Sequence, residues 1–171
     1  LHVNEAYNSY VRLTKAKKEF FELFSSQKFI NERSLTVFYE YFGPVCSCAQ
    51  SLMNAIEAFV NYNIPDDYLF HKNENKSYNK KQFQGWLPLE DKIEFILNPI
   101  MKRNFRLEND IEYSIIKKLK LFRDSVVHTK RIELYEEYQR IFEVALSFDF
   151  AKAISVVRDF INFYEDRLIE P

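Results

Sequence analysis

Apolar side chains recur at helical spacing along most of this chain. From about residue 4 to residue 24, and again from about 34 to 63, they return every three or four positions, which is typical of amphipathic helices. We expect Gly43-Pro44 to kink or divide the second helix, because proline lacks the backbone N–H and its ring clashes with the preceding turn. The second half of that helix should bury one stripe, formed by Val45, Cys48, Ala49, Leu52, Ile56, Phe59 and Val60.

The pattern changes between about residues 64 and 87, where the chain is polar and rich in Asn and Lys. We expect a long polar connection there, followed by a short helix from Pro88 to about Leu97. Further helices are predicted over about 108–127, 132–145 and, capped by Ser147 or Asp149, from 150 onwards. The last two long helices should bury two stripes: Ile111, Ile115, Leu119, Phe122 and Val126, and then Phe150, Ile154, Val157, Ile161, Tyr164 and Leu168.

These elements predict an all-α fold, a bundle of four to five main helices in a single domain over residues 1–171. Gly43 and Gly85 are the only glycines in the sequence. Phosphate-cradling loops and tight hairpin turns use glycine for its backbone freedom, so glycine-rich nucleotide-binding folds and turn-rich β-sandwiches are excluded. The 17 phenylalanines and 11 tyrosines are expected in the core, with any surplus forming a dimer face.

Net charge and cysteine content limit the partners and the cellular location that can be expected for this protein. The net charge of −1 provides no overall attraction to nucleic acid, so any contact with RNA must be local. Cys46 and Cys48 are two residues apart on a predicted helix, which suits reduced thiols in a cytoplasmic protein better than a disulfide. No apolar run approaches the roughly 18 residues of a membrane span, and no ligand motif is present. We therefore expect no membrane association, no metal and no cofactor.

The segment Arg123-Asp124-Ser125-Val126-Val127-His128 carries the chemistry of greatest interest, at the predicted end of a long helix. An imidazole titrates near neutral pH and can exchange protons with a reacting oxygen. A guanidinium stays charged and presents a fork of donors to phosphate oxygens. Asp124 precedes His128 by four residues, so both share one face if the helix continues, and the carboxylate would then fix the imidazole tautomer.

This segment resembles the R-x(4–6)-H motif of the HEPN superfamily, and the segment from Ala55 to Asn61 resembles an earlier core helix of some bacterial members. The resemblance covers about residues 34–166 and leaves the middle connection unaligned. It implies a HEPN-like bundle and a homodimer in which two such motifs face one cleft. In catalytic members the arginine and histidine support metal-independent RNA cleavage, in which the ribose 2′-hydroxyl attacks the adjacent phosphate. Arg123, His128 and Asp124 are then the catalytic candidates.

Supporting positions follow from the earlier segment. Glu57 lies on a largely apolar helix, where its carboxylate either contacts Arg123 or faces solvent, and Asn61 lies one turn further along the same face. Lysines and rings interleave in the polar connection, as single-stranded RNA binding requires, although a solvated loop has the same composition. The candidate RNA contacts are Lys72, Lys76, Tyr78, Lys80, Lys81 and Lys130.

An alternative assigns no chemistry to the motif. Arg123 and His128 would then satisfy the last carbonyls of their helix and interact with the negative end of its dipole. The chain would be a non-catalytic HEPN-like interaction or dimerisation domain that docks an unidentified protein partner. A small-molecule-binding bundle is a third possibility, and only the available aromatic surface speaks for it.

Overall fold

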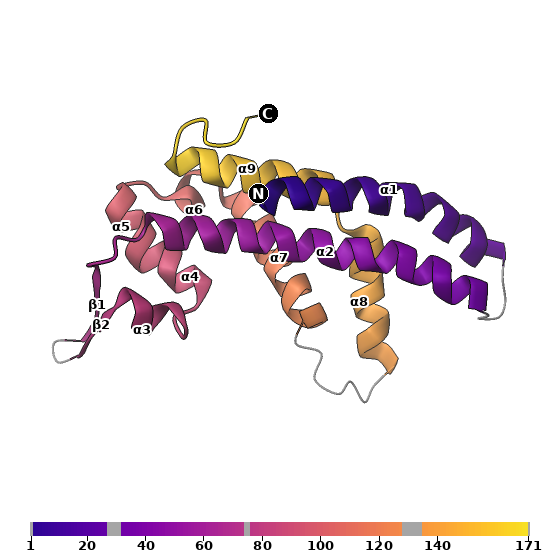
Figure 1. Cartoon of the computed structure of the whole chain (residues 1–171), viewed down its shortest axis with the longest axis horizontal. Coiled ribbons are helices and arrows are strands. Elements are labelled where there is room, and N and C mark those ends of the chain that lie inside the picture. The colour runs from indigo at the N-terminus through magenta and orange to yellow at the C-terminus, as the bar shows by residue number, and fades with distance from the viewer. Residues whose placement is uncertain (1, 27–31, 74–75, 128–134, 171) are drawn as a thin grey trace.

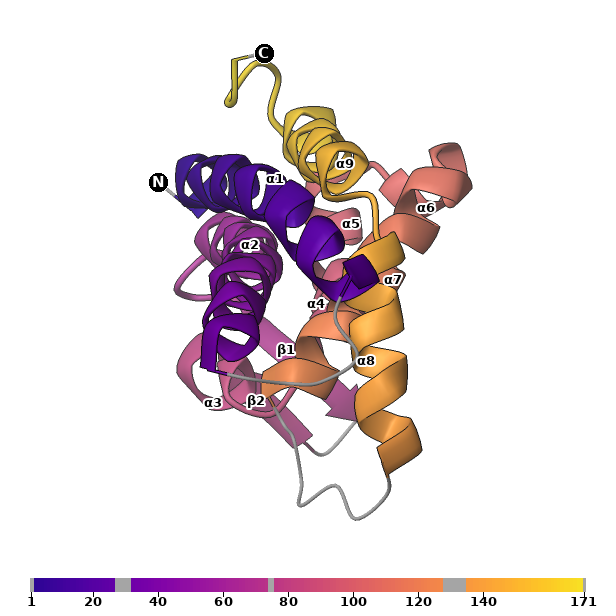
Figure 2. The ribbon, with the colours of Figure 1, turned by 90° about the vertical axis from the view of Figure 1, so that its right-hand side faces the viewer.

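The computed structural model describes residues 2–26, 32–73, 76–127 and 135–170. Helices α1 (His2–Ser26) and α2 (Glu32–Asn63) form a long antiparallel pair, and α9 (Phe150–Tyr164) packs on both (Figure 1). Helices α7 (Asp110–Val127) and α8 (Tyr135–Ser147) run steeply across that pair (Figure 2). Among the described residues, these five helices have 13 or more residues each, so the predicted all-α class is confirmed.

Short elements fill the interval between α2 and α7. In chain order they are β1 (Leu69–Asn73), β2 (Lys76–Asn79), α3 (Lys80–Gln84), α4 (Leu89–Lys92), the π-helical turn η1 (Ile93–Leu97), α5 (Asn98–Met101) and α6 (Phe105–Glu108). From α4 to α5 the backbone is helical without a break. Pro99 directly follows the π-helical turn, in which the Asn98 N–H donates to the Ile93 carbonyl. The helix was expected to end before Pro99, but it continues to Met101.

Helix α2 is continuous through Pro44, so of the two expected effects of Gly43-Pro44, a kink or a division of the helix, the division is wrong. The helix survives because its residues on both sides of the proline are committed to the core, with Tyr41, Val45 and Cys48 at most 2% exposed. Burial of several such side chains at about 1.5–3 kcal/mol each outweighs the roughly 3 kcal/mol cost of an interior proline. All seven residues of the predicted stripe are buried, which confirms which face of α2 meets the core.

The stretch over residues 64–87 is not the irregular polar connection that was expected. Strands β1 and β2 pair antiparallel, with Phe70 opposite Tyr78, and α3 follows directly. Asn79 caps α3 through a reciprocal capping box with Gln82. Trp86 packs its ring edge-on against Tyr78, with centroids 5.0 Å apart, and also contacts Phe70. These ring contacts order a segment whose own sequence shows little periodicity.

Two predicted core positions are exposed. Ile111 is 74% exposed because α6 intervenes and α7 begins at Asp110, so the buried face of α7 is carried by Tyr113, Ile116, Leu119 and Phe122. Leu168 is 51% exposed because α9 ends at Tyr164 and the chain then turns back. Asp149 is the N-cap of α9, accepting from the backbone N–H of Lys152 at 2.9 Å, as one of the two predicted caps requires.

Helix α9 is fastened to α5 and α6 by one buried tyrosine. The Tyr164 hydroxyl donates to Asn98 Oδ1 at 2.6 Å and accepts from the backbone N–H of Phe105 at 3.2 Å. Phe105 also packs edge-on against Phe160, with centroids 5.2 Å apart. This joint sits at the same end of the molecule as the C-terminal half of α2, which carries Glu57 and Asn61 (Figure 1).

Two observations concern the cysteines on α2 and the apolar length of the described helices. Cys46 and Cys48 are free thiols on α2, and burial raises the pKa of Cys46 to about 11 and that of Cys48 to about 12. Within the described ranges, no helix combines the length and the apolar character needed to span a lipid bilayer.

Candidate functional site

The two segments that carry the HEPN resemblance meet in space. Glu57 on α2 and Arg123 on α7 form an ion pair, with Glu57 Oε1 2.7 Å from a terminal guanidinium nitrogen of Arg123. Each residue directly follows a buried one, Ile56 and Phe122, so both lie at the edge of the packed α2–α7 contact. The Arg123 side chain is only 14% exposed, whereas that of Glu57 is 40% exposed. The charged pair therefore opens to solvent on the Glu57 side.

Asp124 is shared between two cations of its own helix. One carboxylate oxygen lies 3.2 Å from Arg123 and the other accepts from Lys120 Nζ at 2.9 Å. Lys120 also reaches Glu90 of α4, at 3.4 Å. The hydrogen bond that Lys120 donates to Asp124, together with the charge of Glu90, raises the pKa of Lys120 above its usual value despite partial burial. Asp124 is thus engaged by Lys120 and Arg123, and this arrangement fixes the orientation of the arginine.

Lys92 belongs to the same group of charges and was not singled out in the sequence. It is only 8% exposed, and its ammonium donates to the backbone carbonyl of Gln84 at 2.9 Å and to Asn61 Oδ1 at 3.5 Å. Burial lowers the pKa of Lys92, and the negative charge of Glu57 partly opposes that effect. A signal was present in the sequence, because Lys92 occupies an apolar position in the stripe that contains Leu89 and Ile93.

We call this group the α2–α7 polar cluster: Glu57, Asn61, Glu90, Lys92, Lys120, Arg123 and Asp124. Its three cations and three carboxylates balance exactly in formal charge. Arg123 Nε is buried and has no hydrogen-bond partner among the described residues. Two of its charges, on Arg123 and Lys92, are largely buried, and burial of charge costs stability. Buried cations with specific charged neighbours occur often at functional sites.

Several predicted site residues lie elsewhere or outside the description. His128 and Lys130 fall outside the described residues, as does the side chain of Lys72. Tyr78 is half-buried against Trp86, and Lys80 is 15% exposed and donates to Asp66 at 2.9 Å, so both have structural partners. The remaining exposed candidates from this stretch are Lys76 and Lys81. Among the described side chains, Lys76, Lys80 and Lys81 do not contribute to the α2–α7 polar cluster.

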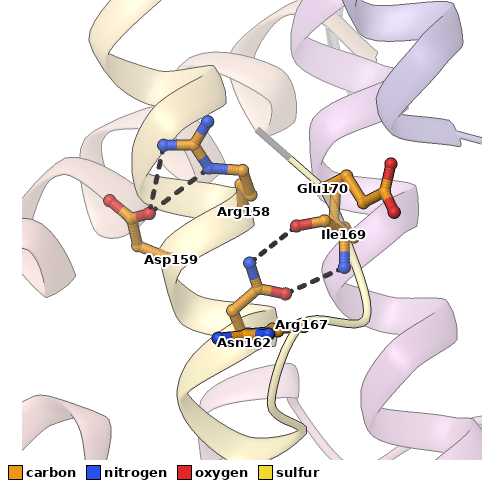
Figure 3. A pocket seen from close by; sticks show the side chains of 6 residues that line it. All are labelled: Arg158, Asp159, Asn162, Arg167, Ile169 and Glu170. Atoms are coloured by element: carbon orange, nitrogen blue, oxygen red, sulfur yellow. Dashed lines mark hydrogen bonds and ion pairs between the residues drawn. The ribbon is translucent and has the colours of Figure 1, made fainter.

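A separate hollow of about 540 Å³ lies between α9 and the C-terminal segment that folds back along it (Figure 3). The side chain of Asn162 binds this segment through two hydrogen bonds. Its Nδ2 donates to the carbonyl of Ile169 at 2.8 Å, and its Oδ1 accepts from the backbone N–H of Ile169 at 2.9 Å. The other lining residues are Arg158, Asp159, Arg167 and Glu170, two bases and two acids. No predicted site residue lines this hollow.

Metal binding gains no support in the described part of the chain, where no group of three or more His, Cys, Asp or Glu side chains is arranged to hold an ion. Comparison with known proteins gives no further guidance, because no family model, curated protein or solved structure matches this chain.

Proposed function

We propose that this chain is a HEPN-like domain that acts on RNA as a homodimer, cleaving it without a metal ion through Arg123 and His128. One observation carries the proposal. The two segments that resemble the superfamily are 66 residues apart in sequence, yet Glu57 and Arg123 meet at 2.7 Å. A chance resemblance would not require the two segments to share one polar cluster.

The proposed chemistry uses the residues in distinct roles. His128 removes the proton of the ribose 2′-hydroxyl, which attacks the adjacent phosphorus, and the bond to the 5′-oxygen breaks as that oxygen gains a proton. The products are a 2′,3′-cyclic phosphate and a free 5′-hydroxyl. Arg123 stabilises the charge that accumulates on the phosphate oxygens. Asp124 holds the guanidinium in position, and a second protomer places its own motif across the cleft.

A second function is favoured by a different observation. Arg123 is 14% exposed and already paired with two carboxylates, an arrangement that also suits a purely structural arginine. The chain would then be a non-catalytic HEPN-like domain that dimerises or docks a protein partner. Exposed rings on α1 and α2 offer apolar surface for such contacts: Phe21 is 44% exposed beside Phe20, and Tyr39 is 67% exposed beside Phe38.

Cleavage of mixed cellular RNA in EDTA tests the proposal. Wild type, His128→Ala and His71→Ala are compared, because His71 is an exposed histidine on β1 that serves as a matched control. We expect wild type and His71→Ala to leave cyclic-phosphate ends and His128→Ala to be inactive with unchanged thermal stability. Equal cleavage by His128→Ala would refute the assigned role. An inactive wild type would favour the non-catalytic domain.

A further inference from the structure

The negative charge of Glu57 acts on two cations that belong to different elements. Glu57 accepts directly from Arg123 of α7, and its charge also acts on the buried Lys92 of α4. The Lys92 ammonium itself donates to uncharged oxygens, those of Gln84 and of Asn61, which lies one turn after Glu57 on α2. The other two carboxylates of the cluster, Glu90 and Asp124, both contact Lys120, and Asp124 also lies 3.2 Å from Arg123.

The cluster would carry one unit of positive charge without Glu57. A phosphodiester carries one negative charge, so it would replace the carboxylate without leaving unbalanced charge in a poorly hydrated site. Arg123 offers a donor geometry that matches phosphate oxygens, and its Nε–H has no partner among the described residues. The cluster thus matches a phosphate group in charge and in donors.

The solvent exposure of each charged side chain indicates which of them can move when a ligand binds. The Arg123 side chain is 14% exposed and Lys92 is 8% exposed, so packing holds both cations in place. Asp124 is retained by Lys120 at 2.9 Å. Glu57, at 40% exposed, can turn into solvent and regain hydration at small cost.

We propose that Glu57 is an internal substitute for phosphate, paired with Arg123 in the free protein and swinging out when a phosphate group binds. This inference rests on the proposed function and adds to it a gate and a third binding residue, Lys92. The ligand is a phosphate group, either within an RNA strand or free in solution. Glu57 then competes with the ligand and lowers its affinity.

Glu57→Gln provides the test, because it removes the competing charge while keeping the shape of the side chain. Glu90→Gln is the matched control, since Glu90 is also 40% exposed and belongs to the same cluster but contacts Lys120. Binding of inorganic phosphate is measured by calorimetry. Binding of a 2′-O-methyl oligoribonucleotide, which cannot be cleaved through its 2′-oxygen, is measured by fluorescence anisotropy. Ionic strength is held constant in both assays.

We expect Glu57→Gln to bind more tightly by about tenfold, the equivalent of losing one competing charge-assisted hydrogen bond, and Glu90→Gln to differ from wild type by less than about threefold. A gain for both probes assigns the site to phosphate in general, and a gain for one probe identifies its source. Unchanged or weaker binding by Glu57→Gln, or an equal gain in Glu90→Gln, would overturn the gate. RNA cleavage without such a gain leaves the nuclease proposal intact, and a gain without cleavage leaves only the phosphate site.

Discussion

Replacing Arg123 by methionine tests whether this arginine serves RNA binding or only stabilises the fold. The substitution removes the guanidinium but keeps a long, flexible side chain that can fill the same space. It breaks the ion pairs with Glu57 and Asp124, at 2.7 and 3.2 Å. Neither carboxylate is stranded, because Glu57 is 40% exposed and can be rehydrated, and Asp124 keeps its hydrogen bond from Lys120.

The structure sets the expected loss of stability. Ion pairs with partly exposed partners contribute about 0–1 kcal/mol each, so the two pairs together account for about 1 kcal/mol. Removing the buried, unpartnered Nε–H of Arg123 relieves a desolvation cost that offsets part of this loss. We therefore expect a decrease in the free energy of unfolding of about 1 kcal/mol or less. In a chain of this size that corresponds to a decrease in Tm of about 2–4 °C.

Calorimetric unfolding and RNA binding by anisotropy are measured on the same preparations. Arg158→Met is the control, because Arg158 also pairs with an acid, Asp159, at 3.4 Å, but lies in the hollow beside α9. We expect Arg123→Met to lose RNA binding and Arg158→Met to retain it, with both proteins folded. A loss of about 3 kcal/mol or more in Arg123→Met together with intact RNA binding would refute the reasoning and assign Arg123 to the fold.

Three further predictions concern stability and assembly. Tyr164→Phe should lower the free energy of unfolding by about 1–3 kcal/mol in urea titrations, because it leaves Asn98 Oδ1 and the Phe105 N–H without their buried partner. Burial raises the pKa of Cys46 to about 11 and that of Cys48 to about 12, from 9.0, so unfolding releases thiol protons above pH 9. Under reducing conditions, the contribution of the two thiols to the free energy of unfolding should therefore be fully present below pH 9 and should decrease as the pH rises towards 12. In Cys48→Ala, the free energy of unfolding should decrease less steeply between pH 9 and 10 than in wild type. Sedimentation equilibrium should give twice the chain mass of 20.7 kDa, and a single-chain mass at all concentrations would contradict the homodimer.

Features that repeat locally along the chain could be predicted from sequence. The stripe from Val45 to Val60 on α2 was identified correctly because burial of one helix face imposes a regular spacing on neighbouring residues. The cap at Asp149 depends on a hydrogen bond to the backbone only three residues away. For the candidate site, the sequence suggested that Glu57 could reach Arg123, and the structure contains that contact.

Features that depend on distant contacts could not be predicted in this way. The β1–β2 hairpin has few apolar residues of its own, and the rings that order it include Trp86, which lies beyond α3. Lys92 is buried by elements that are remote in sequence, including α2, whose Asn61 it contacts. The sequence showed a lysine in an apolar stripe, but only the fold reveals that water is excluded there. Ile111 was misassigned because periodicity alone does not show where one helix ends and the next begins.

The position of α9 has a consequence for how the chain is made. Phe59 and Phe160 pack edge-on with centroids 6.3 Å apart, so the core face of α2 is completed by a helix that follows α7 and α8 in the sequence. On the ribosome, α9 is translated only after the α1–α2 pair and the intervening α7 and α8 have been made. The nascent chain therefore displays part of the apolar stripe of α2 until α9 has been made. Chaperones would have to shield that stripe until α9 docks, and a fragment that stops before Phe150 would be prone to aggregate.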